Sequence, residues 1–362
     1  MSNTLFFTPG PTQLYPETDL FIQEALEKDV CSISHRSQAF KDIYKKTADN
    51  LRELINLPSD WHILFTGSAS EVWERLLTNC CDKKSTHFVN GSFSKKFYQY
   101  ALALGKDTTQ HTVDFGKGIS LEGIETDSAT ELVCLTHNET SAGTSTPVTE
   151  INKARDLFPN ALIAVDTVSS VPYPDYDYSK IDSLFFSVQK CFGLPAGLGV
   201  WVVNEKCIEK ATSLQKKGKV IGAHHDILEL KKKAVNNQTP STPNVLTIFL
   251  LGKVAGKMLA KGGANQLRKE TEQKYDILCA AIEKHPAMSL FVEDEYFRSR
   301  TVVVANTSIT PTDINAALKP LNMQVGAGYG DKKTTQIRIA NFPAFSVEQV
   351  KELAEVLGQI KE

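Results

Sequence analysis

Several motifs that mark common protein classes are missing from this chain of 362 residues. No apolar stretch reaches the roughly 18 residues needed to span a membrane, so no membrane partner is expected. The first residues lack the basic and apolar parts of a signal peptide. Neither the GxGxxG dinucleotide loop nor the GxxxxGKS/T phosphate loop occurs, so the nucleotide-binding classes that use them have no support.

Neither the charged residues nor the cysteines indicate a specialised class of protein. The net charge is −2, from 40 Lys and Arg against 42 Asp and Glu, and no surface for nucleic acid is indicated. The seven cysteines form no CxxC motif and have no nearby histidine at metal-ligating spacing. Free thiols and no metal site are therefore expected. Together with the missing signal peptide, this pattern predicts a cytoplasmic protein.

Helix-like and strand-like patterns alternate along most of the chain. Amphipathic helices are predicted over residues 37–57 and 70–80. Such alternation predicts an α/β fold, in which a mostly parallel sheet is covered by helices on both faces. The ligand site of such a sheet lies at the carboxyl ends of its strands. The predicted strands are 61–65, 87–90, 132–136, 162–166, 184–188 and 199–203.

The character of the sequence changes after residue 219. A polar stretch rich in turn formers covers 220–243, and a long helical pattern then runs over 245–284 with a break at Gly262 and Gly263. The shorter elements beyond it predict a smaller α+β domain. We expect a large domain over 1–245, whose N-terminal segment bridges to the small domain, and a small domain over 246–362. The later elements are predicted at 300–304, 313–318, 337–340 and 347–360.

Two charged residues follow apolar runs of strand length. The run 184–188 leads to Lys190, and the run 161–165 ends in Asp166. A lysine and an aspartate at strand ends suit pyridoxal phosphate, because the lysine forms a Schiff base and the aspartate pairs with the protonated pyridine nitrogen. Taken alone, an ordinary pair of charges is the simpler interpretation in a chain with so many charged residues.

Three further segments bear on that interpretation. Residues 66–70 lie between a strand and a helix, where free N–H groups can bind phosphate, although small residues are routine at such turns. Residues 137–143 bring hydroxyl and amide groups to the same sheet edge. Phe93 could stack on an aromatic ring or simply pack in the core.

Taken in order, these segments resemble the class V, fold-type I pyridoxal-phosphate aminotransferases over almost the whole chain. The resemblance implies a large domain with a mostly parallel sheet covered by helices and a smaller C-terminal α+β domain. Within the family, the chain is most similar to the branch that transfers the amino group of O-phospho-L-serine to 2-oxoglutarate in serine biosynthesis. The matching segments are 7–11, 33–40, 67–70, 189–198, 238–240 and 298–300.

The resemblance implies a role in cofactor chemistry for each matched residue. Lys190 is expected to hold pyridoxal phosphate as a Schiff base and to move protons, and Asp166 to keep the pyridine nitrogen protonated. Thr140 is expected to bond the 3′ oxygen of the ring, and Phe93 to stack on it. The residues expected to hold the cofactor phosphate are Ala69, Ser70 and Gln189, with Gln238 and Thr239 of a second chain in a homodimer.

Substrate contacts follow from the same resemblance. Arg338 suits a bidentate grip on the substrate carboxylate. His35 and Arg36 are expected to meet the side-chain phosphate, although Arg36 could merely pair within its own loop. The expected partners are thus a small amino acid, a 2-oxo acid and a second copy of the chain.

The chain also departs from the pattern of that branch. A second His-Arg pair, which helps to hold the substrate phosphate, is replaced around Tyr329 and Gly330. Residues 137–143 and 166–170 also resemble the alanine– or serine–glyoxylate branch, which stays an alternative. A cysteine desulfurase-like enzyme would usually carry a histidine where Gln189 stands. A non-catalytic protein of this fold would need an added DNA-binding module, and no such segment is seen before Phe6.

Overall fold

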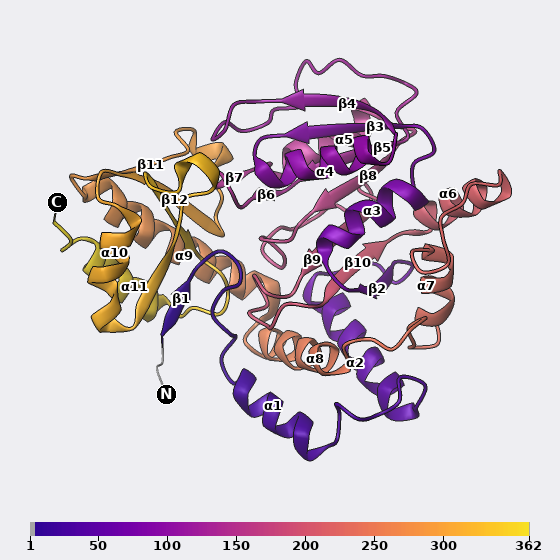
Figure 1. Ribbon diagram of the computed structural model, residues 1–362, viewed down its shortest axis with the longest axis horizontal. Coiled ribbons are helices and arrows are strands. Elements are labelled where there is room, and N and C mark those ends of the chain that lie inside the picture. The colour runs from indigo at the N-terminus through magenta and orange to yellow at the C-terminus, as the bar shows by residue number, and fades with distance from the viewer. Residues whose placement is uncertain (1–3, 362) are drawn as a thin grey trace.

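The computed structural model describes residues 4–361, and its larger sheet has seven strands in the order β2-β10-β9-β8-β5-β3-β4 (Figure 1). Neighbours from β9 to β4 pair in parallel, whereas β10 is antiparallel to both β2 and β9. The prediction of a mostly parallel sheet is confirmed, and β2, β3, β5, β8 and β9 all end at one edge. The strands are β2 (His62–Thr66), β3 (Lys84–Val89), β4 (Asp107–Thr112), β5 (Leu132–Thr136), β8 (Leu162–Asp166), β9 (Ser183–Ser187) and β10 (Gly199–Val203).

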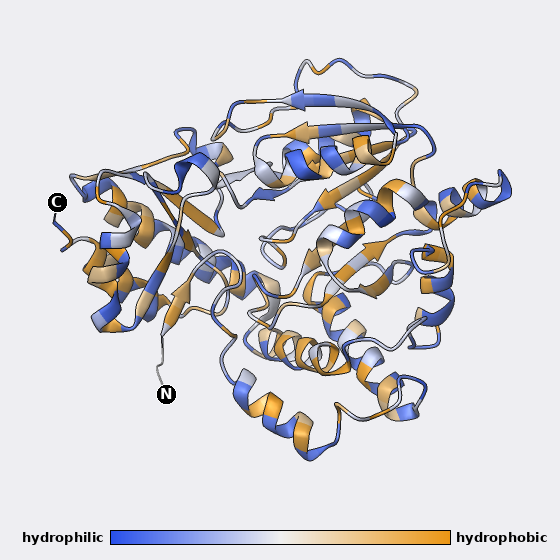
Figure 2. Ribbon diagram, in the orientation of Figure 1, coloured by the Kyte–Doolittle hydropathy of each residue, from blue (hydrophilic) through white to orange (hydrophobic). Residues whose placement is uncertain are grey.

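Successive side chains of the large sheet enter two different cores. In β8, Ile163 and Val165 join the cluster on one face, whereas Leu162 and Ala164 join the cluster on the other. This alternation follows from the period of two in an extended strand. Because both faces are covered, the central strands are apolar along their length (Figure 2). The first face is covered by α2 (Gln38–Leu54), α5 (Val148–Leu157) and α8 (Val245–Ala260), and the second by α3 (Ala69–Asn79), α4 (Ser92–Ala103), α6 (Glu205–Lys216) and α7 (Ile227–Ala234).

A smaller five-stranded sheet forms the second body of the molecule, and Figure 1 draws its strand β1 in indigo and its other strands in orange and yellow. Its order is β1-β13-β14-β12-β11, and β1 runs parallel to β13. The first described residues therefore belong to the same sheet as the C-terminal part of the chain. Its elements are β1 (Leu5–Phe7), β11 (Met288–Leu290), β12 (Val302–Thr307), β13 (Met323–Ala327), β14 (Gln336–Ala340), α9 (Gly263–Lys284), α10 (Pro311–Leu318) and α11 (Val347–Leu357).

The predicted break in the long helical pattern separates α8 from α9. Gly262 and Gly263 both adopt positive φ, 116° and 67°, which glycine tolerates without a steric penalty. The buried residues of α8 pack in the core of the large sheet. In α9, Leu267 still belongs to that core, whereas Tyr275 belongs to the core of the small sheet. We therefore propose a domain boundary within α9, rather than the expected division between residues 245 and 246.

Some elements were not predicted from the sequence. The polar stretch 220–243 contains the helix α7, whose Ile227 and Leu230 are buried. The other elements missing from the prediction include α1 (Thr18–Glu27), β6 (Asn138–Glu139), β7 (Thr144–Ser145) and three short 3-10 helices, η1 (Glu295–Phe297), η2 (Lys319–Leu321) and η3 (Gly330–Lys332).

Within residues 4–361, no helix combines the length and the apolar character that a membrane span requires.

Candidate active site

Lys190 lies among polar and aromatic groups at the carboxyl edge of the large sheet, just after β9. Its side chain is buried, and Nζ donates a hydrogen bond to Thr140 Oγ1 over 2.9 Å. Nζ also lies 4.9 Å from the centre of the Phe93 ring. A Cβ on Gly10 would be 3.0 Å from Lys190 Cε, so the N-terminal segment packs directly on the lysine. Burial lowers the pKa of Lys190 to about 8.

Asp166 is the last residue of β8, next to β9 in the sheet. Its Oδ2 accepts a hydrogen bond from Trp73 Nε1, and its Oδ1 accepts one from the backbone N–H of Val168, both over 3.0 Å. Burial nevertheless raises the pKa of Asp166 to about 6. Among the described residues, this carboxylate has no salt-bridge partner within 4 Å. Asp166 is therefore a buried acid without a salt bridge, and the charge of Lys190 offsets only part of the effect of burial on its pKa.

The hydroxyl of Thr140 is fixed by a polar cluster behind it. Thr140 Oγ1 donates to Ser169 Oγ over 2.8 Å, and Ser169 Oγ accepts from Asn138 Nδ2 over 2.7 Å. Because the hydroxyl proton of Thr140 points to Ser169, the lone pairs of Thr140 Oγ1 are free to accept a hydrogen bond from Lys190. The cluster thus sets the position of the lysine amine.

Phe93 is held by a buried acid at the end of β6. Glu139 Oε2 accepts the backbone N–H groups of Phe93 and Ser94, over 3.1 and 2.9 Å, and Oε1 accepts the Ser141 hydroxyl over 2.6 Å. The carboxylate therefore takes up N–H groups that the first turn of α4 leaves free. A Cβ on Gly91 would lie 2.3 Å from Glu139 Cγ, so glycine is required for this close approach.

The turn between β2 and α3 has both occupied and free donors. The N–H of Ala69, an expected phosphate donor, already bonds Ser187 Oγ over 2.8 Å. Ser70 is exposed, and neither its N–H nor its hydroxyl is hydrogen-bonded within the part of the chain that the structure describes. Gln189 Oε1 is buried and has no hydrogen-bond partner there either. Ser70 thus offers donors at a helix N-terminus, the position that suits a phosphate.

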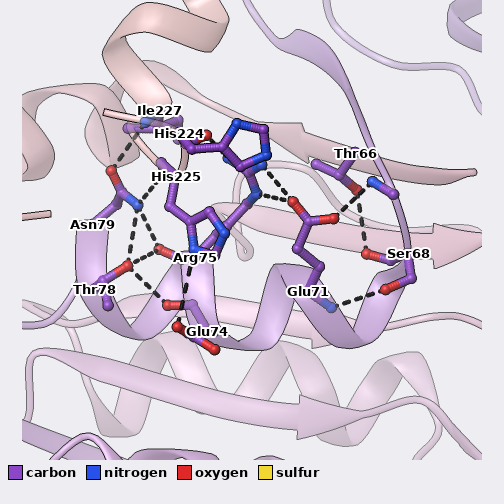
Figure 3. A network of polar contacts seen from close by, with 11 residues as sticks. Thr66, Ser68, Glu71, Glu74, Arg75, Thr78, Asn79, His224, His225 and Ile227 are labelled. Carbon is purple, nitrogen blue, oxygen red and sulfur yellow. Dashed lines mark hydrogen bonds and ion pairs between the residues drawn. The ribbon is translucent and has the colours of Figure 1, made fainter. Parts of the chain in front are cut away.

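A polar network supports this turn from the side (Figure 3). Glu71 accepts the N–H of Gly67 over 2.8 Å and Nε of Arg75 over 2.6 Å, and Arg75 Nη1 donates to the carbonyl of His224 over 3.0 Å. Glu71, His224 and His225 also bring possible metal-ligating atoms within 4.8 Å of one another. The guanidinium of Arg75 already neutralises Glu71, so we interpret this network as a support for the turn.

Arg338 reaches the site from β14 of the small sheet. Its Nη1 donates to the backbone carbonyl of Thr140 over 3.3 Å, and its Nε donates to the carbonyl of Ala327 over 2.8 Å. Its guanidinium carbon lies 5.4 Å from the centre of the Tyr329 ring. Burial lowers the pKa of Arg338 from its ordinary value. Both sheets therefore contribute to the surroundings of Lys190.

The segments 35–36 and 238–239 lie together, and Thr239 lines one cavity with Thr66 and Gly67 of the β2–α3 turn. Arg36 Nη1 donates to Gln238 Oε1 over 3.3 Å and to the carbonyl of Thr239 over 2.8 Å, while Nη2 donates to the next carbonyl over 2.8 Å. Among residues 4–361, no hydrogen bond joins His35 or these three residues to Lys190, Thr140 or Asp166. The structure thus shows that Arg36 pairs with the 238–240 segment.

Sequence reasoning missed the groups that position the expected residues. Trp73 lies in the predicted helix 70–80, and a tryptophan among the apolar residues of such a helix favours core packing. Glu139 and Ser169 lay in the segments that were noted, but nothing in their spacing assigned them partners. Tyr329 drew attention only because it lies in the region where an expected His-Arg pair is missing.

The expected cofactor can be tested against this geometry. Pyridoxal phosphate carries a pyridine nitrogen, which would supply the salt-bridge partner that buried Asp166 lacks. Its phosphate would suit the free donors of Ser70, and its ring would suit the aromatic face of Phe93. Lys190 is a buried amine with a lowered pKa, as a Schiff-base lysine requires. The residues present therefore fit the group.

One family and several known proteins are similar to this chain over nearly its whole length. The family described as aminotransferase class-V matches residues 4–335. A solved structure of a phosphoserine aminotransferase from Cytophaga hutchinsonii is 52% identical, covers 99% of both chains and has a TM-score of 0.98. A curated phosphoserine aminotransferase from Nocardioides sp. is 26% identical over 357 residues, which cover 98% of this chain and 94% of that protein.

A more distant similarity concerns the glyoxylate branch. The solved structure of an alanine–glyoxylate aminotransferase from Nostoc sp. has a TM-score of 0.81 and 19% identity, and the match covers 98% of this chain and 94% of that one. At this identity the similarity shows the fold alone.

Proposed function

From the premise that the chain belongs to the class-V aminotransferases, we propose that it transfers the amino group of O-phospho-L-serine to 2-oxoglutarate in serine biosynthesis. The family resemblance predicted from the sequence is confirmed, and with it an aminotransferase that uses pyridoxal phosphate. The observation that carries the choice of phosphoserine is the 52% identity, over 99% of both chains, to a phosphoserine aminotransferase.

Lys190 is proposed as the residue that bonds the cofactor and moves protons at the substrate. Pyridoxal phosphate, when bound, supplies a ring that accepts the electrons released at the substrate Cα. Lys190 Nζ would take the Cα proton as a base and return a proton as an acid. Because burial lowers its pKa to about 8, more of the amine is neutral near pH 7 than for an exposed lysine. Thr140, 2.9 Å away, orients it.

The other residues of the site would bind and orient. Asp166 would place a negative charge beside the pyridine nitrogen, held in position by Trp73. Phe93 would stack on the ring, and Ser70 and Gln189 would bind the phosphate, together with Ala69 once its bond to Ser187 opens. Arg338 would bind the substrate carboxylate, because its guanidinium already lies against the Thr140 loop.

We propose a homodimer in which each chain completes the site of its partner. Gln238 and Thr239 would reach the partner's cofactor phosphate, and His35 and Arg36 the side-chain phosphate of its substrate. The support is that Arg36 binds the 238–240 segment, so that both segments form one unit, and no hydrogen bond among residues 4–361 joins this unit to its own Lys190. We further propose that the protein acts in the cytoplasm, since it carries six buried free cysteines.

The alternative is an alanine– or serine–glyoxylate aminotransferase, favoured by the missing second His-Arg pair. A panel of half-reactions distinguishes the two. The purified holoenzyme is mixed with phosphoserine, serine or alanine, and the absorbance of the lysine-bound cofactor is followed. We expect phosphoserine to react with the highest kcat/KM and 2-oxoglutarate to restore the absorbance. A preference for alanine or serine with glyoxylate would overturn the proposal.

A cysteine desulfurase-like activity has little support from the site. Such an enzyme needs a mobile cysteine that reaches the cofactor. Cys191, next to Lys190, is buried in the core of the small sheet, and burial raises the pKa of its thiol well above the ordinary range. Cys191 is therefore interpreted as a packing residue.

A further inference from the structure

We propose that Lys96 and Tyr329 form a binding subsite for the second acidic group of the substrate, at the end of its side chain. The inference rests on the proposed function, which supplies a substrate with an anionic group at each end. Lys96 lies on α4, three residues after Phe93. Side chains at this spacing lie on one face of a helix.

Two amines thus lie around one aromatic ring. Lys96 Nζ is 5.5 Å from the centre of the Phe93 ring, and Lys190 Nζ is 4.9 Å from the same centre. The two nitrogens are therefore at most about 10 Å apart. One amine is buried and belongs to the reacting centre, whereas the other lies on the exposed rim.

Tyr329 links the rim amine to the cation of the small sheet. Lys96 Nζ donates to the Tyr329 hydroxyl over 3.2 Å and lies 5.8 Å from the centre of its ring. The same ring lies 5.4 Å from the guanidinium carbon of Arg338 and 5.4 Å from the Phe93 ring. Tyr329 therefore lies between two cations, and a small substrate could present one acidic group to each of them.

The charge of Lys96 is free for such a role. No carboxylate lies within salt-bridge distance of it among residues 4–361. An ammonium group binds phosphate or carboxylate as a compact point charge. Together with the proposed contact of Arg36, the subsite would thus take the phosphate of phosphoserine and, in the other half-reaction, the side-chain carboxylate of a 2-oxo diacid. Tyr329 occupies the region where the second His-Arg pair is missing.

A solvated lysine on a helix surface is the competing interpretation, and the chain offers a matched control for it. Lys95 is the preceding residue of α4, is also exposed and has no described side-chain contact. Lys95→Gln therefore makes the same chemical change on the same turn, away from the ring of Phe93.

The test compares substrates and ligands with one or two acidic groups. Wild type, Lys96→Gln, Lys96→Arg and Lys95→Gln holoenzymes are each mixed with phosphoserine or alanine in single half-reactions. We expect Lys96→Gln to lower kcat/KM for phosphoserine about tenfold or more, with alanine changed less than about twofold. Lys96→Arg should restore most of the loss, and Lys95→Gln should match wild type for both donors.

A binding measurement separates this inference from the proposed function. Calorimetric titration of the holoenzymes with glutarate, which has two carboxylates, and butyrate, which has one, requires no turnover. Lys96→Gln should weaken glutarate binding about fivefold or more relative to butyrate. Equal effects on both ligands, or a Lys96→Gln enzyme like Lys95→Gln, would overturn the subsite. A wild-type enzyme that does not react with phosphoserine would instead overturn the proposed function. The glutarate comparison would still decide the role of Lys96.

Discussion

The carboxylate of Glu139 accepts the backbone N–H of Phe93 over 3.1 Å, and this bond fixes the ring that faces Lys190. Glu139 is fully buried and also receives the N–H and hydroxyl of Ser94 and the hydroxyl of Ser141. One acid thus joins the start of α4 to the loop that carries Thr140. Phe93 and Glu139 lie 46 residues apart in the sequence.

Replacement of Glu139 by glutamine should destabilise the protein. Glutamine keeps one acceptor oxygen, but its amide turns a donor toward the donors of α4 and leaves buried N–H groups unpaired. We expect a loss of about 3 kcal/mol in the free energy of unfolding. Urea titration measures it, with Glu122→Gln at an exposed position as the control. Equal stability of the two variants would contradict the assigned contact.

Asp166 should make the cofactor-free protein less stable as the pH rises. Its pKa is raised from 3.8 to about 6 in the folded protein, so between these values the native state binds more protons than the unfolded state. The stabilising contribution is present below pH 3.8 and is lost as the pH passes 6, by about 3 kcal/mol. Unfolding titrations from pH 4 to 7 should show this decrease in wild type relative to Asp166→Asn. A pH-independent difference between the two would refute it.

Lys190 should be the residue that bonds the cofactor. Reduction of the holoenzyme with borohydride makes the bond permanent, and peptide mapping then locates it. We expect the label on the peptide that contains Lys190, and Lys190→Ala should lose the absorbance of the lysine-bound cofactor. A label on any other lysine would rule out the assignment.

Mixed dimers should reveal whether Arg36 serves the partner's site. Lys190→Ala and Arg36→Ala chains are each expected to turn over phosphoserine poorly alone. After the chains are mixed by mild dissociation, one site of each mixed dimer has both residues intact. Activity should then rise to about a quarter of wild type, as random pairing in a two-fold dimer requires.

No recovery in dimers shown by mass to be mixed would place Arg36 and Lys190 in the same chain's site. Re-mixed wild-type chains, taken through the same dissociation, supply the reference activity. A fully active monomer in sedimentation of dilute holoenzyme would exclude the shared site altogether.

Many of the elements could be predicted from short stretches of sequence, because a buried element shows a characteristic spacing of apolar residues. The strands 162–166 and 199–203 were predicted with the bounds that the structure shows, since each is a short apolar run between turns. The helix α7 was missed because its polar face dominates the composition of 220–243, and only Ile227 and Leu230 are buried. Its position depends on packing against β2 and α6, which no local pattern reports.

The sequence by itself determined the chemistry at the strand ends. Lys190 and Asp166 follow buried strands, and parallel strands bring their carboxyl ends to one edge whatever the strand order. Only the tertiary structure decided what surrounds them. Trp73 meets Asp166 across 93 residues, and Arg36 meets Thr239 across 203. Such contacts depend on how whole elements pack, because a hydrogen bond needs its donor and acceptor about 3 Å apart. The spacing of two segments in the sequence carries no information on that distance.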